Sequence, residues 1–462
     1  MSRTTSSHKL SFKEKLGYGL GDMASNFYLG FFGLFLLYYY TDVYGLAPAA
    51  VAFMLLVSKI IDAVSDPGMG LIADRTDSKW GKYRPYLLWG AIPYGILGFA
   101  IFFGPNFSDT GKLIYAYVTY VGVMLAFTLV NVPYSALLAV ISPSAEERTK
   151  ATTYRLALAG TGSLLVAALA TPLTRWLGGG DELLGFRLTM GIFAVASVLL
   201  FWFTFATTKE RIKANVQPTS VKNDFGTLLS NRSWIALAIA CVLIVVAVVA
   251  RFASSIFYVK YYLGGADEIV FWIFDKVAVF SSIGLIGQII GAAITPILIR
   301  YADKHRLVIL MSLLHAVFLV LGFFTPQENY WLAVTLHFFG IGTFGATITL
   351  LFSMFTDCAE YGEWKTGKRI SGLTVSASMF ALKFGSALGG AIPGFILAAI
   401  GFVANEAQSD GSTMGIRVMA TIVPAVLVVI GGLAMIYYKI DRQMLAQIEQ
   451  DLAQRRESAG AS

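Results

Sequence analysis

The stretch Pro67-Gly-Met-Gly-Leu-Ile-Ala-Asp74-Arg75 has a counterpart later in the chain, Pro296-Ile-Leu-Ile-Arg-Tyr-Ala-Asp303-Lys304. In each copy an acidic residue and then a basic residue follow the proline at the same distance. A second pair of segments, both rich in small residues, shares a late proline, at Pro172 and at Pro393. Two matches at a similar offset favour a chain that contains two copies of one unit.

The composition around these segments is that of a membrane protein. Of the 462 residues, 56% are apolar and 14% are charged, whereas about 25% are charged in a typical soluble domain. The mean hydropathy is +0.67, and 45 glycines suit helices that pack closely in a bilayer. These values exclude a disordered chain and an ordinary cytosolic enzyme. The two cysteines, Cys241 and Cys358, lie in separate segments, so we expect neither a disulfide framework nor a cysteine metal site.

Twelve apolar runs are long enough to cross about 30 Å of hydrocarbon. They cover residues 17–41, 47–73, 85–104, 113–142, 151–176, 186–206, 232–262, 270–299, 306–324, 331–356, 370–402 and 414–438. We therefore predict an all-α membrane protein with 12 transmembrane helices. A polar middle loop, 207–231, separates two six-helix bundles, 1–206 and 232–438, and a tail follows at 439–462. Two related bundles of six helices are the architecture of the major-facilitator fold.

The basic residues predict the orientation of these helices. One set of loops and both termini carry 25 of the 35 Lys and Arg residues, and the opposite loops carry only five. The positive-inside rule therefore places both termini in the cytoplasm, in a multi-pass protein of the cell inner membrane. The net charge of +7 follows from this topology, so we expect no nucleic-acid partner.

An acidic pair inside the second span is the strongest candidate for a binding site. Asp62 and Asp66 are four residues apart, so both carboxylates lie on one helix face, with hydroxyls from Ser58 and Ser65 nearby. Two carboxylates in one cavity repel each other, and a proton or a small cation such as Na⁺ relieves that repulsion. The alternative is that Asp66, which precedes Pro67, only caps the helix or pairs with a basic loop residue.

Other polar side chains also lie within the predicted spans, where each is costly unless it pairs or binds. They include Asp22, Asn26, Thr128, Asn131, Arg155, Arg251 and Lys383. An asparagine in a bilayer bonds either a neighbouring helix or a sugar hydroxyl in a wet cavity. Arg155 is either an inner-face anchor or part of a site. Arg251 and Lys383 lie in mid-span, so each needs a carboxylate, a water-filled cavity or an anionic ligand. Asp275 and Lys276 are interpreted as rim charges in preference to a gate pair.

The sequence resembles the glycoside–pentoside–hexuronide:cation symporters, the family of the melibiose permease. The resemblance rests on Lys15-Leu-Gly-Tyr-Gly-Leu-Gly-Asp22 with Tyr40-Thr-Asp42, Asp62-Ala-Val-Ser-Asp66-Pro67, Trp80-Gly-Lys-Tyr-Arg84-Pro85, and Tyr361-Gly-Glu363 with the basic run to Arg369. It covers nearly the whole chain and implies a major-facilitator fold with alternating access. It also implies symport of a sugar with a monovalent cation, H⁺ or Na⁺, without another cofactor.

The resemblance further implies roles for individual residues. Asp62, Asp66, Ser65 and Thr128 match the positions that hold the coupling cation. Asp22, Asn26, Asn131, Ser135, Arg155, Arg251 and Lys383 form the predicted substrate site. Asn26 and Asn131 stand where the permease has carboxylates, as in the xyloside and glucuronide branches. Ser65 replaces an asparagine, which leaves H⁺ and Na⁺ both open.

Opposite charges on the inner loops of the two halves predict a cytoplasmic gate. It comprises Asp74, Arg75 and Arg84 from the first half, and Glu363 and Arg369 from the second. We expect a functional monomer in the lipid bilayer. No catalytic motif is present, so an enzyme is excluded, and no repeated filter segment indicates a channel. The alternatives are a symporter of an anionic sugar, a uronide or a sulfonated sugar, and a lysolipid-type transporter of the same fold.

Overall fold

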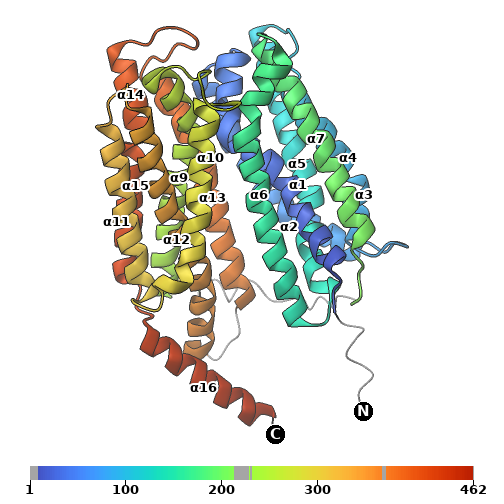
Figure 1. Cartoon of the computed structure of the whole chain (residues 1–462). Helices are drawn as coiled ribbons and strands as arrows, with labels where there is room; N and C mark the ends of the chain where they lie inside the picture. Colours follow the sequence, from blue (N-terminus) through green and yellow to red (C-terminus); the bar gives the residue numbers. More distant parts are fainter. Residues whose placement is uncertain (1–8, 213–227, 229–230, 367–370, 461–462) are drawn as a thin grey trace. The chain divides into compact units, whose positions relative to one another are not determined.

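The computed structural model describes residues 9–212, 228, 231–366 and 371–460 (Figure 1). The elements described in the first half of the chain are all helices. Its elements are α1 (Phe12–Tyr38), the π-helical turn η1 (Tyr39–Val43), α2 (Pro48–Arg75), α3 (Arg84–Trp89), α4 (Ala91–Ile101), α5 (Asp109–Ile141), α6 (Ala145–Gly178) and α7 (Glu182–Thr207).

The second half repeats this pattern with one short hairpin. Its elements are α9 (Arg232–Phe257), the π-helical turn η2 (Tyr258–Leu263), β1 (Ile269–Phe271), β2 (Phe274–Asp275), α10 (Lys276–Leu298), α11 (Lys304–Phe323), α12 (Tyr330–Thr366), α13 (Ser371–Ala399), α14 (Asp410–Ala420), α15 (Ile422–Ala434), the 3-10 turn η3 (Met435–Tyr437) and α16 (Arg442–Gly460).

These helices confirm the predicted all-α class. Within the described part of the chain, ten helices are long and apolar enough to cross a membrane. The two other predicted spans, 47–73 and 85–104, are also helical. The first is α2, which is apolar over Pro48–Lys59 and then carries the acidic pair. The second is α3 followed by α4, and the helix continues between them because Gly90 has α-helical dihedrals and hydrogen bonds on both sides.

Polar residues fix where several helices begin. Ser11 and Glu14 form a capping box at α1, in which each side chain accepts a backbone N–H of the other residue. Single side-chain caps start α5, α6, α7, α9 and α14, at Ser108, Ser144, Asp181, Asn231 and Ser409. α6 ends at Gly179, whose φ of 57° is left-handed and suits a residue without a side chain.

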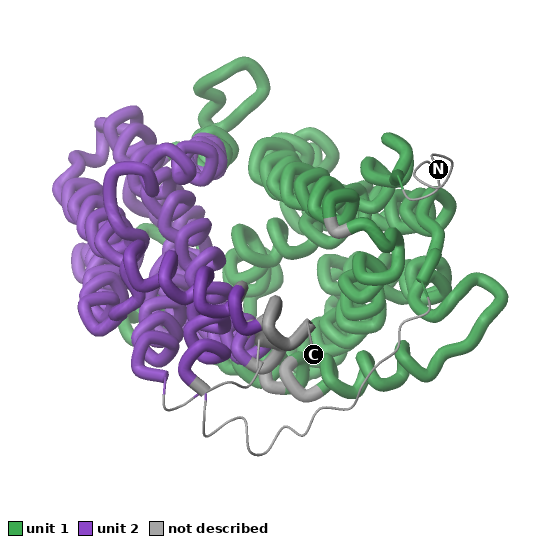
Figure 2. Tube along the Cα trace, turned by 90° about the horizontal axis from the view of Figure 1, so that it is seen from below, with its two compact units in different colours: residues 1–217, 265–282, 397–408 green, residues 218–264, 283–396, 409–462 purple. Residues whose placement is uncertain are grey.

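The chain forms two compact units (Figure 2). Unit 1 comprises Met1–Gln217, Gly265–Ser282 and Leu397–Gln408, and unit 2 comprises Pro218–Gly264, Ile283–Ile396 and Ser409–Ser462. In unit 1, α1 packs against α6 and α7, while α5 packs against α2 and α4. Aromatic residues fill this core, and the Tyr28 ring stacks on Tyr94 at 4.2 Å and covers Gly98, where a side chain would overlap it.

In unit 2, α11 packs against α12 and α15, and α15 packs against α9. Glycines bring α10 and α12 into backbone contact. A Cβ added at Gly291 would overlap the Gly342 carbonyl oxygen, and one added at Gly345 would overlap the Gln288 carbonyl oxygen. Small residues at such crossings allow membrane helices to gain close packing, which drives their association.

The C-terminal helix α16 belongs to the same core. Ile448 and Leu452 are buried with residues of α9 and α12. The Trp364 indole at the end of α12 donates to Asp451 at 2.7 Å, and Arg455 donates to the Trp364 carbonyl at 3.0 Å. The tail predicted at 439–462 is therefore a docked helix over most of its length.

Candidate functional site

The four predicted cation ligands lie together inside unit 1, on α2 and α5. Asp62 and Thr128 are buried, with exposed fractions of 3% and 2%. The Thr128 Oγ1 lies 3.1 Å from Asp62 Oδ1 and also 3.1 Å from Asp66 Oδ1. Ser65 Oγ lies 3.4 Å from Thr128 Oγ1 and 3.1 Å from the Asp62 carbonyl oxygen. Ser58 donates to the Met54 carbonyl one turn away, at 2.8 Å.

One threonine hydroxyl between two carboxylates limits what the site can hold. Thr128 has a single hydroxyl proton, so it donates to only one carboxylate at a time. The other close contact would set two oxygen lone pairs against each other unless that carboxyl group carries a proton or shares a cation. A proton or a cation held between Asp62 and Asp66 is compatible with this geometry.

A second polar group joins α1, α5 and α6. The Arg155 guanidinium Nε lies 3.0 Å from Asp22 Oδ2, and both side chains are largely buried. The guanidinium carbon lies 5.1 Å from the ring centroid of Tyr134, which stacks on Tyr18 at 4.9 Å. The Tyr134 hydroxyl donates to the Tyr18 carbonyl at 2.6 Å. Arg155 is thus held inside the unit by an acid and an aromatic face, and Asp22 offsets its charge.

Both predicted asparagines lie beside this ion pair. The Asn26 amide donates to the Asp22 carbonyl at 2.8 Å and accepts from the Ser163 hydroxyl of α6 at 3.2 Å. The Asn131 amide donates to the Ser25 hydroxyl of α1 at 3.1 Å. Each amide has two N–H groups and two carbonyl lone pairs, so these bonds use only part of its capacity. The amides hold helices together and retain donors and acceptors for a ligand.

The remaining predicted substrate residues are spread over the two units. Ser135 is exposed on α5, one turn beyond Asn131. Lys383 is exposed on α13 of unit 2, and Arg251 is buried inside unit 2 on α9. Their roles in substrate binding stay predictions.

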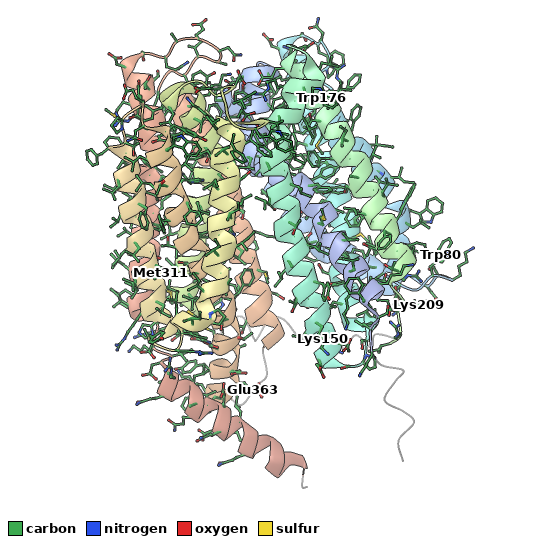
Figure 3. The ribbon with its side chains drawn as sticks, viewed as in Figure 1. Trp80, Lys150, Trp176, Lys209, Met311 and Glu363 are labelled. Atoms are coloured by element: carbon green, nitrogen blue, oxygen red, sulfur yellow. The ribbon has the colours of Figure 1, made fainter. Side chains whose placement is uncertain are left out.

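The residues predicted to form the gate in the first half lie at one end of unit 1, and their role stays a prediction. The Tyr83 hydroxyl donates to Asp74 Oδ1 at 2.7 Å, and burial together with this carboxylate raises the pKa of the Tyr83 phenol. Arg84 donates to the Phe205 carbonyl at 2.7 Å, and Arg75 is exposed. Figure 3 labels Trp80, Lys150 and Lys209 at this same end of the unit, and Trp176 at the opposite end.

The residues predicted to form the gate in the second half are less fully described. Figure 3 shows Glu363 near the end of α12, and Arg369 lies outside the described residues. Near that end, the Lys304 ammonium contacts both oxygens of Asp357, at 2.7 and 2.9 Å. Lys304 is the counterpart of Arg75 in the repeated motif.

Sequence reasoning missed Glu210, which organises the inner loop of unit 1. Its carboxylate accepts the backbone N–H groups of Lys82, Tyr83 and Arg84, at 2.9, 2.8 and 3.0 Å. Gly81, with φ of 106°, makes the turn and leaves room for this carboxylate. The long polar connection after residue 206 was the one hint of such a residue in the sequence. The contacts themselves join positions about 126 residues apart, so the local sequence does not reveal them.

We expect Glu210→Ala to loosen this loop. A hydrogen bond to a charged group contributes about 1.5–3 kcal/mol, and three are lost here. Limited proteolysis should cut residues 76–84 faster than in the wild type. Glu146→Ala is the matched control, since that carboxylate is exposed and pairs only locally with Lys150. Equal cleavage in the two variants would contradict the role given to Glu210.

Sequence reasoning also misread residues 270–275 as helix. They form the β1–β2 hairpin, with Ile269 paired to Asp275 and Phe271 paired to Phe274. Asp275 is buried, so it is not a rim charge, and it accepts from the Thr171 hydroxyl at 2.8 Å. Arg175 donates to the Asp267 and Ile273 carbonyls, at 3.0 and 3.1 Å. These bonds to α6 hold the hairpin within unit 1.

Comparisons with known proteins agree with this architecture. A family model described as MFS/sugar transport protein matches residues 17–442. The uncharacterized symporter YnaJ of Bacillus subtilis is 37% identical, over 97% of this chain and 96% of that protein. The inner membrane symporter YicJ of Escherichia coli is 35% identical, over 97% and 96%. The isoprimeverose transporter of Lactiplantibacillus pentosus is 32% identical, over 96% and 92%.

Solved structures show the same fold at low identity. A bacterial homologue of the human drug peptide transporters PepT1 and PepT2 superposes with a TM-score of 0.66. The two chains are 12% identical, and the match covers 95% of this chain and 99% of that one. This likeness concerns the fold alone.

Proposed function

The chain belongs to the MFS/sugar transport protein family, and on that premise we propose that it imports a neutral glycoside or related sugar together with one proton. It is a secondary transporter of the major-facilitator type and not an enzyme. The observation that carries the proposal is the single Thr128 hydroxyl between the carboxylates of Asp62 and Asp66.

A proton fits between these two carboxyl groups. When Asp66 is protonated, its O–H donates to Thr128 Oγ1, and the Thr128 hydroxyl donates to ionised Asp62. Both contacts of 3.1 Å are then hydrogen bonds. A desolvated Na⁺ would need more oxygen ligands, and Ser65 supplies a hydroxyl where the related permease offers an amide carbonyl.

The polar group around Asn26 and Asn131 is the proposed sugar site. Amide groups recognise neutral hydroxyls as both donors and acceptors. The ion pair between Arg155 and Asp22 leaves no excess charge beside them, which favours a neutral sugar over an anionic one. The relative named as an isoprimeverose transporter supports a glycoside substrate.

Helix α5 links the two sites. Thr128 and Asn131 are three residues apart and so lie on the same side of the helix, with Ser135 further along it. A proton bound beside Thr128 therefore lies about one helical turn from Asn131. A potential of roughly 150 mV releases about 3.5 kcal/mol per charge, which sustains sugar accumulation of about several hundredfold.

The membrane setting is also part of the proposal. We place the protein in the cell inner membrane as a functional monomer surrounded by lipid, with both termini in the cytoplasm. The excess of Lys and Arg in one set of loops supports this orientation. A related protein is named an inner membrane symporter.

Asn26→Ala and Asn131→Ala should each weaken sugar binding about threefold to tenfold. A hydrogen bond to a neutral hydroxyl contributes about 0.5–1.5 kcal/mol, which corresponds to this range. The measurement is calorimetric titration of the purified protein with its glycoside. Ser163→Ala, which removes a partner of Asn26 without removing an amide, is the control. If both asparagine variants bind the sugar with wild-type affinity, these amides only hold helices together and do not contact the sugar.

Ser65→Asn should introduce stimulation of uptake by Na⁺. The added amide carbonyl gives a cation the oxygen ligand that the wild type lacks at this position. Uptake is measured at fixed membrane potential with the Na⁺ and pH gradients imposed separately. The wild type should respond to the pH gradient alone. Accumulation by the wild type that follows Na⁺ and ignores pH would overturn proton coupling.

A thermal-shift screen tests the substrate class. A ligand that binds only the native state raises the melting temperature in proportion to the logarithm of its concentration over Kd. The purified protein is screened against neutral glycosides, uronides and lysolipids at several pH values. Stabilisation by a neutral glycoside is expected, and stabilisation by a uronide or lysolipid alone would refute the proposal.

A further inference from the structure

The β1–β2 hairpin packs in one unit of the chain, but the chain continues from both its ends into the other unit. Unit 2 includes α9 and η2 and continues to Gly264, and α10 enters unit 2 again at Ile283. The hairpin lies in the intervening segment, Gly265–Ser282, which belongs to unit 1. Any movement of unit 2 against unit 1 must therefore either carry the hairpin along or bend the chain beside it.

Asp275 at the end of β2 makes the central contact of the hairpin with unit 1. This residue is 2% exposed. One carboxylate oxygen accepts both the Thr171 hydroxyl of α6, at 2.8 Å, and the backbone N–H of Ala278, at 2.9 Å. The second of these bonds caps the first turn of α10. The same acid thus fixes the hairpin to α10 and holds both on α6.

Arg175 lies one turn beyond Thr171, on the same face of α6. Its guanidinium donates to the Asp267 carbonyl before β1 and to the Ile273 carbonyl before β2. It also lies 3.9 Å from the second carboxylate oxygen of Asp275. One face of α6 therefore binds both arms of the hairpin.

The chain bends most easily at the start of the hairpin. Gly264 and Gly265 have φ of 73° and 62°, left-handed values that glycine adopts without steric cost. The division between the two units falls between these two residues. At its other end the hairpin continues without a break into α10. The hairpin is therefore hinged towards α9 and rigidly joined to α10.

A second connection of the second half is anchored in the same way. Residues Leu397–Gln408, at the end of α13 and before α14, pack in unit 1. The Asn405 amide donates there to the Asp42 carbonyl at 2.6 Å, and Asn405 has a left-handed φ of 59°. Unit 1 thus holds two connections whose flanking helices run into unit 2.

We propose that Asp275, Thr171 and Arg175 form a latch, which holds the hairpin on α6 in one state of the transport cycle and releases it in the other. Secondary transporters of this type change access by rocking one bundle against the other, and α10 would then pull the hairpin from α6. Figure 3 shows Trp176, next to Arg175, at the end of unit 1 opposite Lys150. The latch is therefore at the outer face in the orientation proposed above. It rests on the transport cycle of the proposed function, but on neither the coupled ion nor the sugar.

The first test measures the separation of the hairpin from α6. Trp272→Cys at the hairpin tip and Trp176→Cys on α6 replace side chains that are 79% and 77% exposed, so both accept a spin label. Cys241 and Cys358 are buried and stay unlabelled. In the full-length protein, pulsed electron resonance should resolve a short distance for the latched hairpin and a longer one for the released hairpin. Asp275→Asn should raise the ratio of long to short about tenfold, because an amide accepts these hydrogen bonds more weakly than a carboxylate.

Asp267→Asn is the matched control, since it removes the same charge from an exposed side chain of the same hairpin. It should give the wild-type distances, because the Asp267 backbone carbonyl still accepts from Arg175. One unchanged short distance in the wild type and in Asp275→Asn, or an equal shift in Asp267→Asn, would overturn the latch.

A cross-link tests whether release is needed for transport. Thr171→Cys combined with Asp275→Cys places two thiols where the side chains now touch, within reach of a disulfide. Oxidation should stop uptake of a labelled glycoside into proteoliposomes, and reduction should restore it. Thr174→Cys combined with Thr189→Cys is the control, because those hydroxyls lie 3.3 Å apart on α6 and α7, two helices wholly within unit 1. The control cross-link should leave uptake unchanged.

Full uptake by the oxidised 171–275 pair would contradict the proposal, and so would a failure of these two cysteines to cross-link. If no form of the protein takes up a glycoside, the proposed substrate is wrong, and the spin-label distances still decide whether the latch exists.

Discussion

Asp62→Asn is expected to abolish proton-driven accumulation of the sugar, reducing a gradient of about several hundredfold to simple equilibration. The carboxylate of Asp62 is buried and accepts from Thr128, so it carries the ionised half of the proposed proton site. An amide at this position cannot carry the negative charge that binds a proton between the two acidic side chains. Exchange of labelled sugar between loaded vesicles and medium should persist, because the proposed sugar contacts remain.

Two further variants sharpen this prediction. Thr128→Val removes the hydroxyl between the acids while keeping the shape of the side chain, so it should weaken coupling without altering exchange. Asp77→Asn is the matched control, since Asp77 is an exposed acid in the loop after α2. Concentrative uptake by Asp62→Asn at the wild-type level would show that the coupling proton binds elsewhere.

The second large effect concerns stability. Gly291→Ala should destabilise unit 2, because the new methyl group would overlap the Gly342 carbonyl oxygen on α12. A backbone atom cannot rotate away as a side chain can, so α10 and α12 must separate. Overpacking of this kind costs about 1–3 kcal/mol, and loss of the close helix contact adds to it.

Thermal unfolding of the purified variant measures this effect. Gly390→Ala on α13 is the matched control, because nothing lies within 4 Å of a Cβ added there. The control should melt at the wild-type temperature or slightly above it, since alanine favours the helix. If Gly291→Ala also melts like the wild type, the described contact between α10 and α12 is wrong.

Much of the fold could be predicted because apolar length is a direct physical signal. A run of about 20 apolar residues is helical in a bilayer whatever its neighbours are. The spacing of Asp62 and Asp66 placed both acids on one face of α2 from the sequence alone. The contact of these two acids with Thr128 depends on the packing of α2 against α5. Only the family resemblance predicted that contact.

The features that sequence reasoning missed depend on distant contacts. Residues 270–275 are as apolar and aromatic as a span, yet Trp272 has a left-handed φ of 52° and the chain turns there. Glu210 meets the loop at residues 82–84 only through the folded unit. The sequence around Arg251 did not indicate that histidines lie near it, because His315 and His337 come from two other helices.

Proteoliposomes that contain only this protein give the most direct test of the central claim, that one proton bound between Asp62 and Asp66 drives sugar import. Labelled glycoside uptake is followed with an inward pH gradient at clamped potential, and sugar and proton fluxes are counted together. We predict accumulation above equilibrium with one proton per sugar, lost in Asp62→Asn. Uptake that only equilibrates in the wild type, or that carries no proton with the sugar, would contradict the account.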